Sequence, residues 1–190
     1  MKKNRLKIVI NAPVILSFVL ISFIATLLNQ ITGGVSNAMF FMTYHSPLTS
    51  PLTWLRFFTH VFGHSGWEHL IGNMTYLLLL GPMLEEKYGS ADILKVIAVT
   101  ALMTGLVNYI FFPNVALCGA SGVVFALILL SSIVGVRQRE IPLTFILVAV
   151  IFLGQQVYEG IAIEDNISNM AHIVGGIIGS VFGYIFNRKK

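Results

Sequence analysis

The sequence predicts an all-helical protein that is embedded in a membrane. Of its 190 residues, 56% are hydrophobic and only 11% are charged, and the mean hydropathy is +0.83. An average soluble domain is about 45–50% apolar and about 25% charged. Eight acidic and twelve basic side chains cannot cover the exterior of a soluble protein of this length. Because a spanning helix takes about 20 residues, we expect one transmembrane domain over residues 1–190 and no separate soluble domain.

Six apolar stretches are separated by polar or helix-breaking residues, and each can form a helix that crosses all or most of a bilayer. The first follows a basic start and ends at the Asn-Gln-Ile-Thr-Gly-Gly run of residues 29–34. The second ends at the charged residues 85–87, and Pro113 ends the third. The polar run of residues 137–140 separates the fourth from the fifth, and an acidic loop over 159–165 precedes the sixth. The expected helices cover residues 8–28, 67–84, 93–112, 119–136, 141–158 and 168–186.

The basic residues predict the orientation. They precede the first span, lie between the second and third and between the fourth and fifth, and follow the sixth, with Arg56 as the exception. By the positive-inside bias, both termini of this multi-pass protein are expected in the cytoplasm. Alternatively, the basic start, the first apolar run and Ser36-Asn37-Ala38 form a cleaved signal peptide. The run is longer than the roughly 7–15 residues of such a peptide, which favours a retained helix.

The connection between the first two spans is unusual. Residues 29–66 are too many for a tight connector, and they are rich in aromatic side chains such as Trp54, Phe57 and Phe58. Irregular backbone survives at membrane depth where protein or a water-filled cavity satisfies its polar groups, and Trp and Tyr favour the interface. We expect this segment to be partly inserted in the membrane and to lie against the bundle.

Polar side chains inside spans are costly and mark function by default. Ser121 opens the fourth span within Gly119-Ala120-Ser121-Gly122. Glycines on both sides allow another backbone or a substrate to approach, and the free N–H groups at a helix start favour negative charge. This environment suits a nucleophile whose attack generates an oxyanion. Small-residue clusters are also ordinary packing devices in membrane helices, so the motif alone is a weak signal.

His172 lies in the sixth span on the same face as Gly175, Gly179 and Gly183, which form a stripe of small residues. A similar stripe with Gly122 and Ala126 begins beside Ser121. If the two faces meet, the imidazole lies next to the hydroxyl and can act as its base. A lone histidine in a membrane is equally compatible with a core residue or a proton relay. The pairing with a glycine-flanked serine favours catalysis.

The third polar cluster is His60-x3-His64-x4-His69-x3-Asn73. His69 and Asn73 share one helix face, where two neutral donors suit the stabilisation of a tetrahedral intermediate. A metal site is the alternative, but the spacing misses both histidine–glutamate zinc motifs and no cysteine or acidic cluster completes a ligand set. We therefore expect no metal and no cofactor. His60 and His64 more plausibly hold the inserted loop by hydrogen bonds. Cys118 is expected to be a small packing residue.

Taken together, these motifs resemble those of the rhomboid family of intramembrane serine proteases. The resemblance covers most of the chain, and its motifs are highly specific in combination. It is carried by Arg56-x3-His60-x3-His64-x4-His69-x3-Asn73, by Gly81-x3-Glu85, by Gly119-Ala-Ser121-Gly122, and by Ala171-His172-x2-Gly175-x3-Gly179.

The resemblance implies the six-helix rhomboid fold, in the minimal form found in bacterial cell membranes. It also implies a dyad of Ser121 as nucleophile and His172 as general base, with an oxyanion hole from Asn73, His69 and the Ser121 backbone N–H. Phe125 stands where the family commonly has a ring against the catalytic histidine, but it lacks a hydroxyl. Arg56 and Glu85 match positions thought to stabilise the loop and the helices. The implied substrates are single-span membrane proteins cleaved at small residues.

Two other functions fit the sequence less well. A protease-dead relative that binds membrane clients is expected to lack the serine or the histidine, and both are present. A transporter with a polar pathway predicts repeats or paired broken helices, which the sequence does not contain. Gln155 and Gln156 in the fifth span are compatible with a gate, a water path or bonds between helices. No basic–aromatic stripe suited to nucleic acid occurs.

Overall fold

Helices make up most of the computed structural model, which describes residues 8–134, 140–162 and 166–188. Within these ranges no strand forms, and one isolated bridge joins Thr43 to Leu117. The predicted all-helical class is therefore confirmed for the described part of the chain. The elements are α1 (Pro13–Ile31), the π-helical turn η1 (Asn37–Phe41), α2 (Pro51–Thr59), the 3-10 turn η2 (His60–Phe62), α3 (Trp67–Tyr88), α4 (Ser90–Phe111), α5 (Ser121–Ser132), α6 (Leu143–Ala162) and α7 (Asn166–Arg188).

Every expected helix is present in the described residues, but several ends differ from the prediction. α1 begins at Pro13 rather than at residue 8, because proline has a preset φ and lacks the N–H that a first helical residue cannot bond. α3 continues past Pro82 to Tyr88. It stops where Gly89 takes a φ of +87°, a left-handed conformation that ends helices.

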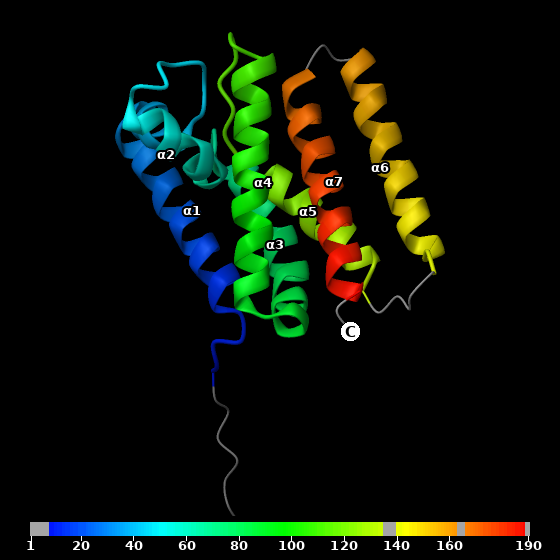
Figure 1. Ribbon diagram of the computed structural model, residues 1–190. Coiled ribbons are helices and arrows are strands. Elements are labelled where there is room, and N and C mark those ends of the chain that lie inside the picture. Colours follow the sequence, from blue (N-terminus) through cyan, green and yellow to red (C-terminus); the bar gives the residue numbers. More distant parts are fainter. Residues whose placement is uncertain (1–7, 135–139, 163–165, 189–190) are drawn as a thin grey trace, which may run out of the picture.

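The fourth expected helix is shorter than the predicted 119–136. α5 has 12 residues, which is about 18 Å of helix against a hydrocarbon core of about 30 Å. In Figure 1 the chain descends from the end of α4 before α5 begins near mid-height of the bundle. Ser121, the first residue of α5, is therefore carried to the interior of the molecule by an extended segment.

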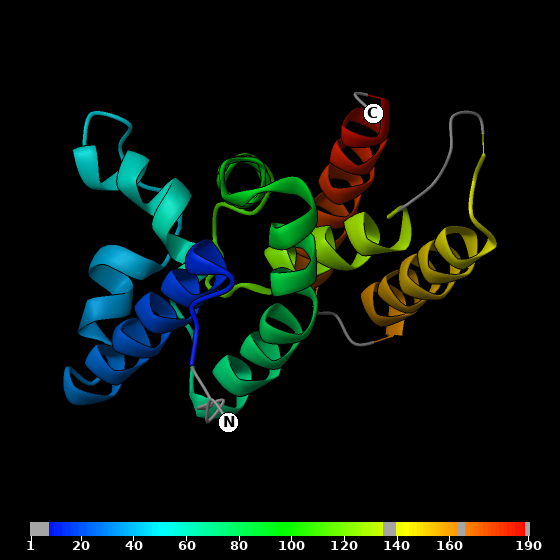
Figure 2. The same ribbon diagram turned by 90° about the horizontal axis from the view of Figure 1, so that it is seen from below.

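Three of the described helices are long and apolar enough to cross a membrane, and this makes the chain an integral membrane protein. They are Pro13–Ile31, Ser90–Phe111 and Asn169–Arg188. The described start of α1, the α3–α4 turn and the end of α7 lie together at the lower end of the bundle in Figure 1. Seen from below in Figure 2, α5 occupies the interior, while α6 and α2 lie at opposite edges.

A buried carboxylate joins α1 to α3 and α4. Glu85 is only 3% exposed, and it accepts hydrogen bonds from the backbone N–H groups of Val14 and Ile15, each at 3.0 Å. The hydroxyl of Ser90 donates to it at 2.7 Å. A carboxylate at a helix N-terminus satisfies amides that have no partner within the helix and interacts favourably with the helix dipole. This explains how an acid is accommodated at the α1–α3 contact.

The long connection packs one face of α2 on α4. The Phe57 ring meets the Tyr109 ring edge-on at 5.4 Å between centroids, and Gly105 leaves room for the backbone of Phe57. On the other face, Trp54, Leu55 and Phe58 are exposed. The segment thus lies against the bundle on one side and presents apolar side chains on the other.

Candidate active site

The segment before α5 is held by backbone hydrogen bonds to the long connection. Leu117 and Thr43 exchange two of them, at 2.9 and 2.8 Å, and the N–H of Gly119 donates to the carbonyl of His60 at 3.0 Å. α5 then begins at Ser121, and its first internal bond runs from Val124 N–H to Ala120 O at 2.9 Å. The N–H groups of the first turn are therefore not used within the helix. They form a donor-rich end beside the serine.

Gly119 lies against two polar side chains of α3, those of His69 and Asn73. Its φ is +131°, a conformation that a residue with a side chain rarely adopts. A Cβ added there would lie 2.8 Å from Cε1 and 2.9 Å from Nε2 of His69, and 4.0 Å from Nδ2 of Asn73. The two side chains that share a face of α3 thus border the chain two residues before Ser121.

Asn73 carries an unused donor at this place. The residue is 8% exposed, and its Nδ2 has no hydrogen-bond partner among the described residues. A buried amide without a partner costs free energy unless something supplies an acceptor. The position suits an anionic oxygen generated next to Gly119.

α5 and α7 approach each other through their small residues. A Cβ added at Gly175 would lie 2.0 Å from the carbonyl oxygen of Gly122, and one added at Gly179 would lie 2.0 Å from that of Ala126. Only glycine allows backbones to come this close. The two stripes of small residues described from the sequence therefore lie against each other.

His172 borders this α5–α7 contact. Its ring lies 4.3 Å from the ring of Phe125, with 44° between the planes. The carbonyl oxygen of the preceding residue, Ala171, lies 3.2 Å from a Cβ added at Gly122. Ser121 and His172 are thus chain neighbours of residues that touch across the contact, and both are partly exposed.

The side chains of His60 and His64 form hydrogen bonds within the long connection, and that of His60 also contacts α4. The Nδ1–H of His60 donates to Arg56 O at 3.0 Å, and its Nε2 lies 3.2 Å from the hydroxyl of Thr104 on α4. The Nδ1–H of His64 donates to Phe62 O at 3.1 Å, and the carbonyl of His64 accepts from Asn37 Nδ2 at 3.0 Å. Burial lowers the pKa of both imidazoles to about 4, so both are neutral at physiological pH.

Arg56 also acts within the connection. It is 7% exposed, its Nε donates to Met39 O at 3.0 Å, and its guanidinium lies 4.5 Å from the centre of the Tyr44 ring. These contacts join the beginning and the end of the segment. Neither of these contacts of Arg56 involves Ser121.

Among the remaining candidates, the structure describes the side chain of Cys118 but not those of the two glutamines in α6. Burial raises the pKa of the Cys118 thiol to about 11, which keeps it protonated and a poor nucleophile. The side chains of Gln155, Gln156 and Glu159 and all of residues 163–165 lie outside the described part, and so do the basic residues before residue 8.

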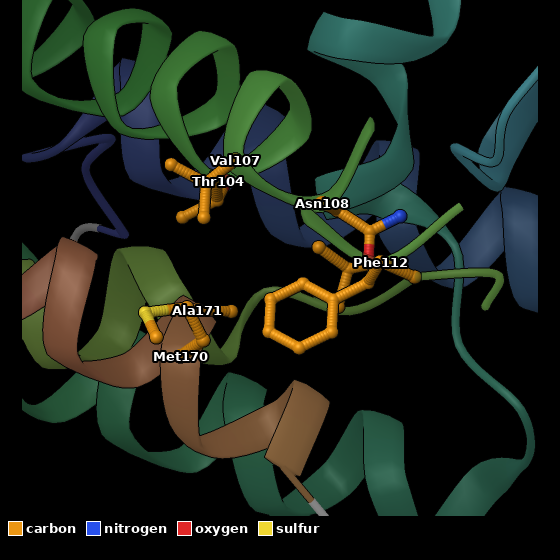
Figure 3. Close-up of a pocket in the computed structure, with 7 residues that line it drawn as sticks. Thr104, Val107, Asn108, Phe112, Met170 and Ala171 are labelled. Atoms are coloured by element: carbon orange, nitrogen blue, oxygen red, sulfur yellow. The ribbon is translucent and has the colours of Figure 1, made fainter. Parts of the chain in front are cut away.

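A narrow pocket between α4 and α7 is lined in part by residues that the sequence motifs do not include, among them Asn108. Asn108 is 2% exposed and donates from Nδ2 to Val115 O at 3.1 Å, which holds the start of the segment that leads to α5. The available signal is a pair of polar residues four apart, Thr104 and Asn108, in the largely apolar second half of the helix. Figure 3 shows the lining residues, which are Thr104, Val107, Asn108, Phe112, Leu117, Met170 and Ala171.

Comparison with known proteins agrees with these motifs. Residues 51–189 match the family model of the Rhomboid domain. The chain is 34% identical to Rhomboid-related protein 1 of Caenorhabditis elegans over 140 residues, which are 68% of this chain and 39% of that protein. It is 28% identical to Rhomboid protease GlpG of Haemophilus influenzae over 172 residues, covering 86% of this chain and 85% of that protein.

A third relative is Rhomboid protease GluP of Bacillus subtilis, with 28% identity over 173 residues, or 87% of this chain and 33% of that protein. The chain thus spans well under half the length of Rhomboid-related protein 1 and of GluP. The match to the family model, residues 51–189, contains all of the motifs from Arg56 to Gly179.

Proposed function

The chain belongs to the rhomboid family, and on that basis we propose that it is an intramembrane serine endopeptidase. Its substrates are single-span membrane proteins, and it hydrolyses peptide bonds in or near their transmembrane segments. Ser121 is the nucleophile and His172 is the general base. Two relatives that carry the name rhomboid protease support this assignment.

The observation that carries the proposal is the close approach of α5 and α7. A Cβ at Gly175 would overlap the carbonyl of Gly122. Ser121 precedes Gly122, and His172 lies about one helical turn before Gly175, so both side chains border one helix contact. The Phe125 ring at 4.3 Å supports an imidazole that lies over the first turn of α5.

In the proposed reaction the Ser121 hydroxyl attacks the scissile carbonyl carbon while His172 accepts the hydroxyl proton. The tetrahedral intermediate collapses when the C–N bond breaks, and His172 returns the proton to the leaving amine. Water then attacks the acyl-enzyme with His172 again as the base, which releases the carboxylic acid product and regenerates the hydroxyl. We expect a dyad, since nothing in the sequence marks an acidic residue as a third member that orients the imidazole.

The charge that develops on the carbonyl oxygen needs donors that are already in place. The first-turn N–H groups of α5, the Asn73 amide and the His69 ring are the proposed donors. The buried Asn73 Nδ2 without a partner supports this role. The proximity of both side chains to Gly119 supports it as well.

In the membrane, the proposed arrangement has six membrane helices, cytoplasmic termini and a site that opens to the opposite side. The short α5 supports a recessed serine, because a helix of about 18 Å that begins inside the bundle leaves its first residue below the surface. The exposed apolar face of α2, with Trp54, Leu55 and Phe58, supports partial insertion of the connection into lipid.

The test is cleavage of a labelled single-span protein by the purified chain reconstituted in liposomes. Ser121→Ala and His172→Ala are each expected to lower the rate by at least about 1,000-fold. Ser131→Ala is the matched control, because that hydroxyl on α5 donates to the carbonyl of Ile128 within its own helix, and its rate should stay within about twofold of wild type. Cleavage by Ser121→Ala at the wild-type rate would refute the proposed nucleophile.

A further inference from the structure

Ser65, just before α3, contacts the side of the His69 ring that faces away from Gly119. Its Oγ lies 3.2 Å from His69 Nδ1. The opposite nitrogen, Nε2, is the one that a Cβ at Gly119 would approach to 2.9 Å. Ser65 is exposed, and a hydroxyl can either donate a hydrogen bond to His69 Nδ1 or accept one from it. The serine is therefore a second contact of an imidazole whose other edge borders the proposed active site.

A neutral imidazole carries one N–H, and the hydrogen bond at one nitrogen decides which nitrogen carries it. If the Ser65 hydroxyl donates to Nδ1, the proton of His69 lies on Nε2 and faces the segment that leads to Ser121. If Nδ1–H donates to Ser65, a lone pair faces that segment instead. A lone pair at this position would repel a developing oxyanion, whereas an N–H would stabilise it.

The other ring in contact with His69 cannot take the place of Ser65. The His64 ring meets it edge-on at 5.0 Å between centroids. The Nδ1–H of His64 donates to Phe62 O, which leaves Nε2 of this neutral ring as an acceptor only. Among these two neighbours, only the Ser65 hydroxyl is able to donate to His69 Nδ1.

We propose that Ser65 is a positioning residue, whose hydroxyl donates to His69 Nδ1 and keeps the N–H of His69 on Nε2, directed at the oxyanion formed by attack of Ser121. The inference rests on the proposed function. Ser65 itself touches neither the substrate nor the reacting atoms. It acts through the tautomer and the orientation of His69. Ser65 is not among the residues that the sequence motifs singled out.

The first test is the ¹⁵N NMR spectrum of the imidazoles in protein labelled at histidine, with His69→Ala to assign the signals. At mildly alkaline pH, wild-type protein should show a protonated Nε2 and a bare Nδ1 at His69. Ser65→Ala should shift this ring toward a mixture of tautomers, and Ser65→Thr should restore the wild-type signals. Thr75→Ala is the control, because the Thr75 hydroxyl on α3 bonds the carbonyl of Ile71 and not His69.

The second test is kinetic. Loss of one hydrogen bond of ordinary strength predicts that Ser65→Ala lowers kcat by roughly three- to tenfold with KM unchanged, that Ser65→Thr recovers it, and that Ser65→Ala has no further effect in a His69→Ala background. A protonated Nδ1 in wild type, or wild-type kcat and signals in Ser65→Ala, would overturn the inference. If Ser121→Ala cleaves like wild type, the proposed function fails instead, and the NMR measurement still decides the Ser65–His69 hydrogen bond.

Discussion

The substitution Gly175→Ala tests whether the α5–α7 contact positions the proposed catalytic groups. The new Cβ would lie 2.0 Å from Gly122 O, 2.8 Å from Gly122 C and 3.0 Å from Gly122 Cα. A carbon normally stays about 3.3–3.6 Å from a carbonyl oxygen, so the two backbones must separate by more than about 1 Å. The obstacle is backbone on both sides, and no side-chain rotation relieves it.

The separation acts directly on the chemistry, because Ser121 and His172 are carried by the two helices that move apart. A misplacement of about 1 Å can cost 100-fold in rate, while the overpacking itself costs about 1–3 kcal/mol of stability. We expect Gly175→Ala to lower cleavage of a labelled single-span substrate in liposomes by about 100-fold or more. The protein should remain folded, with a modest drop in melting temperature.

Gly183→Ala is the matched control on the same stripe of α7. Its new Cβ would lie 3.0 Å from Ile133 Cδ1, 3.3 Å from Ile133 Cβ and 3.5 Å from Leu130 Cδ1, so shifts of a few tenths of an ångström accommodate it and no backbone atom stands in its way. Cleavage should stay within about threefold of wild type. Wild-type activity in Gly175→Ala would refute the reasoning, as would an equal loss in both variants.

Three further predictions follow from other contacts. Asn73→Ala should lower kcat by about 100- to 1,000-fold, with KM nearly unchanged, because it removes a donor that the transition state uses; a loss confined to KM would contradict this role. Glu85→Ala should lower the free energy of unfolding in detergent by about 1–3 kcal/mol, because two first-turn amides of α1 lose their acceptor; Glu85→Gln should recover part of the loss, and an unchanged unfolding curve for Glu85→Ala would count against the cap. Acid should destabilise the fold through His60 and His64, whose pKa burial lowers from 6.5 to about 4. The unfolded chain then binds more protons than the folded one between these values, so stability is complete above about pH 6.5 and falls toward pH 4, by about 1.4 kcal/mol per pH unit for each histidine. A melting temperature that stays constant across this window would show that the two rings are not buried and neutral.

The helices were predictable because hydrophobic runs and helix breakers are local signals. The positions of the helix ends were less predictable. The second helix is predicted to end at residue 84, before the first charged residues, but Glu85 is buried against the start of α1. A buried acid becomes acceptable only when amides from a distant helix satisfy it. No pattern within 67–88 announces that partner.

The candidate site was predictable to the extent that small-residue spacing encodes helix packing. The stripes around Gly122 and Gly175 indicated which faces of α5 and α7 meet. The exact bounds of α5 were not predicted, because the helix runs over Ser121–Ser132 rather than 119–136. The segment before it pairs its backbone with Thr43, and pairing between segments so far apart in the chain has no local sequence signature. The contact of Ser65 with His69 was missed because Ser65 lies before the helix, where the four-residue period does not apply.

The central claim, that Ser121 is a nucleophile activated by His172, is tested most directly by covalent labelling. The reconstituted protein is treated with a serine-reactive fluorophosphonate, and the modified residue is located by mass spectrometry. We predict one adduct on Ser121 in wild type and none in His172→Ala. An adduct at Cys118 or another residue in place of Ser121, or undiminished labelling of Ser121 in His172→Ala, would contradict the account.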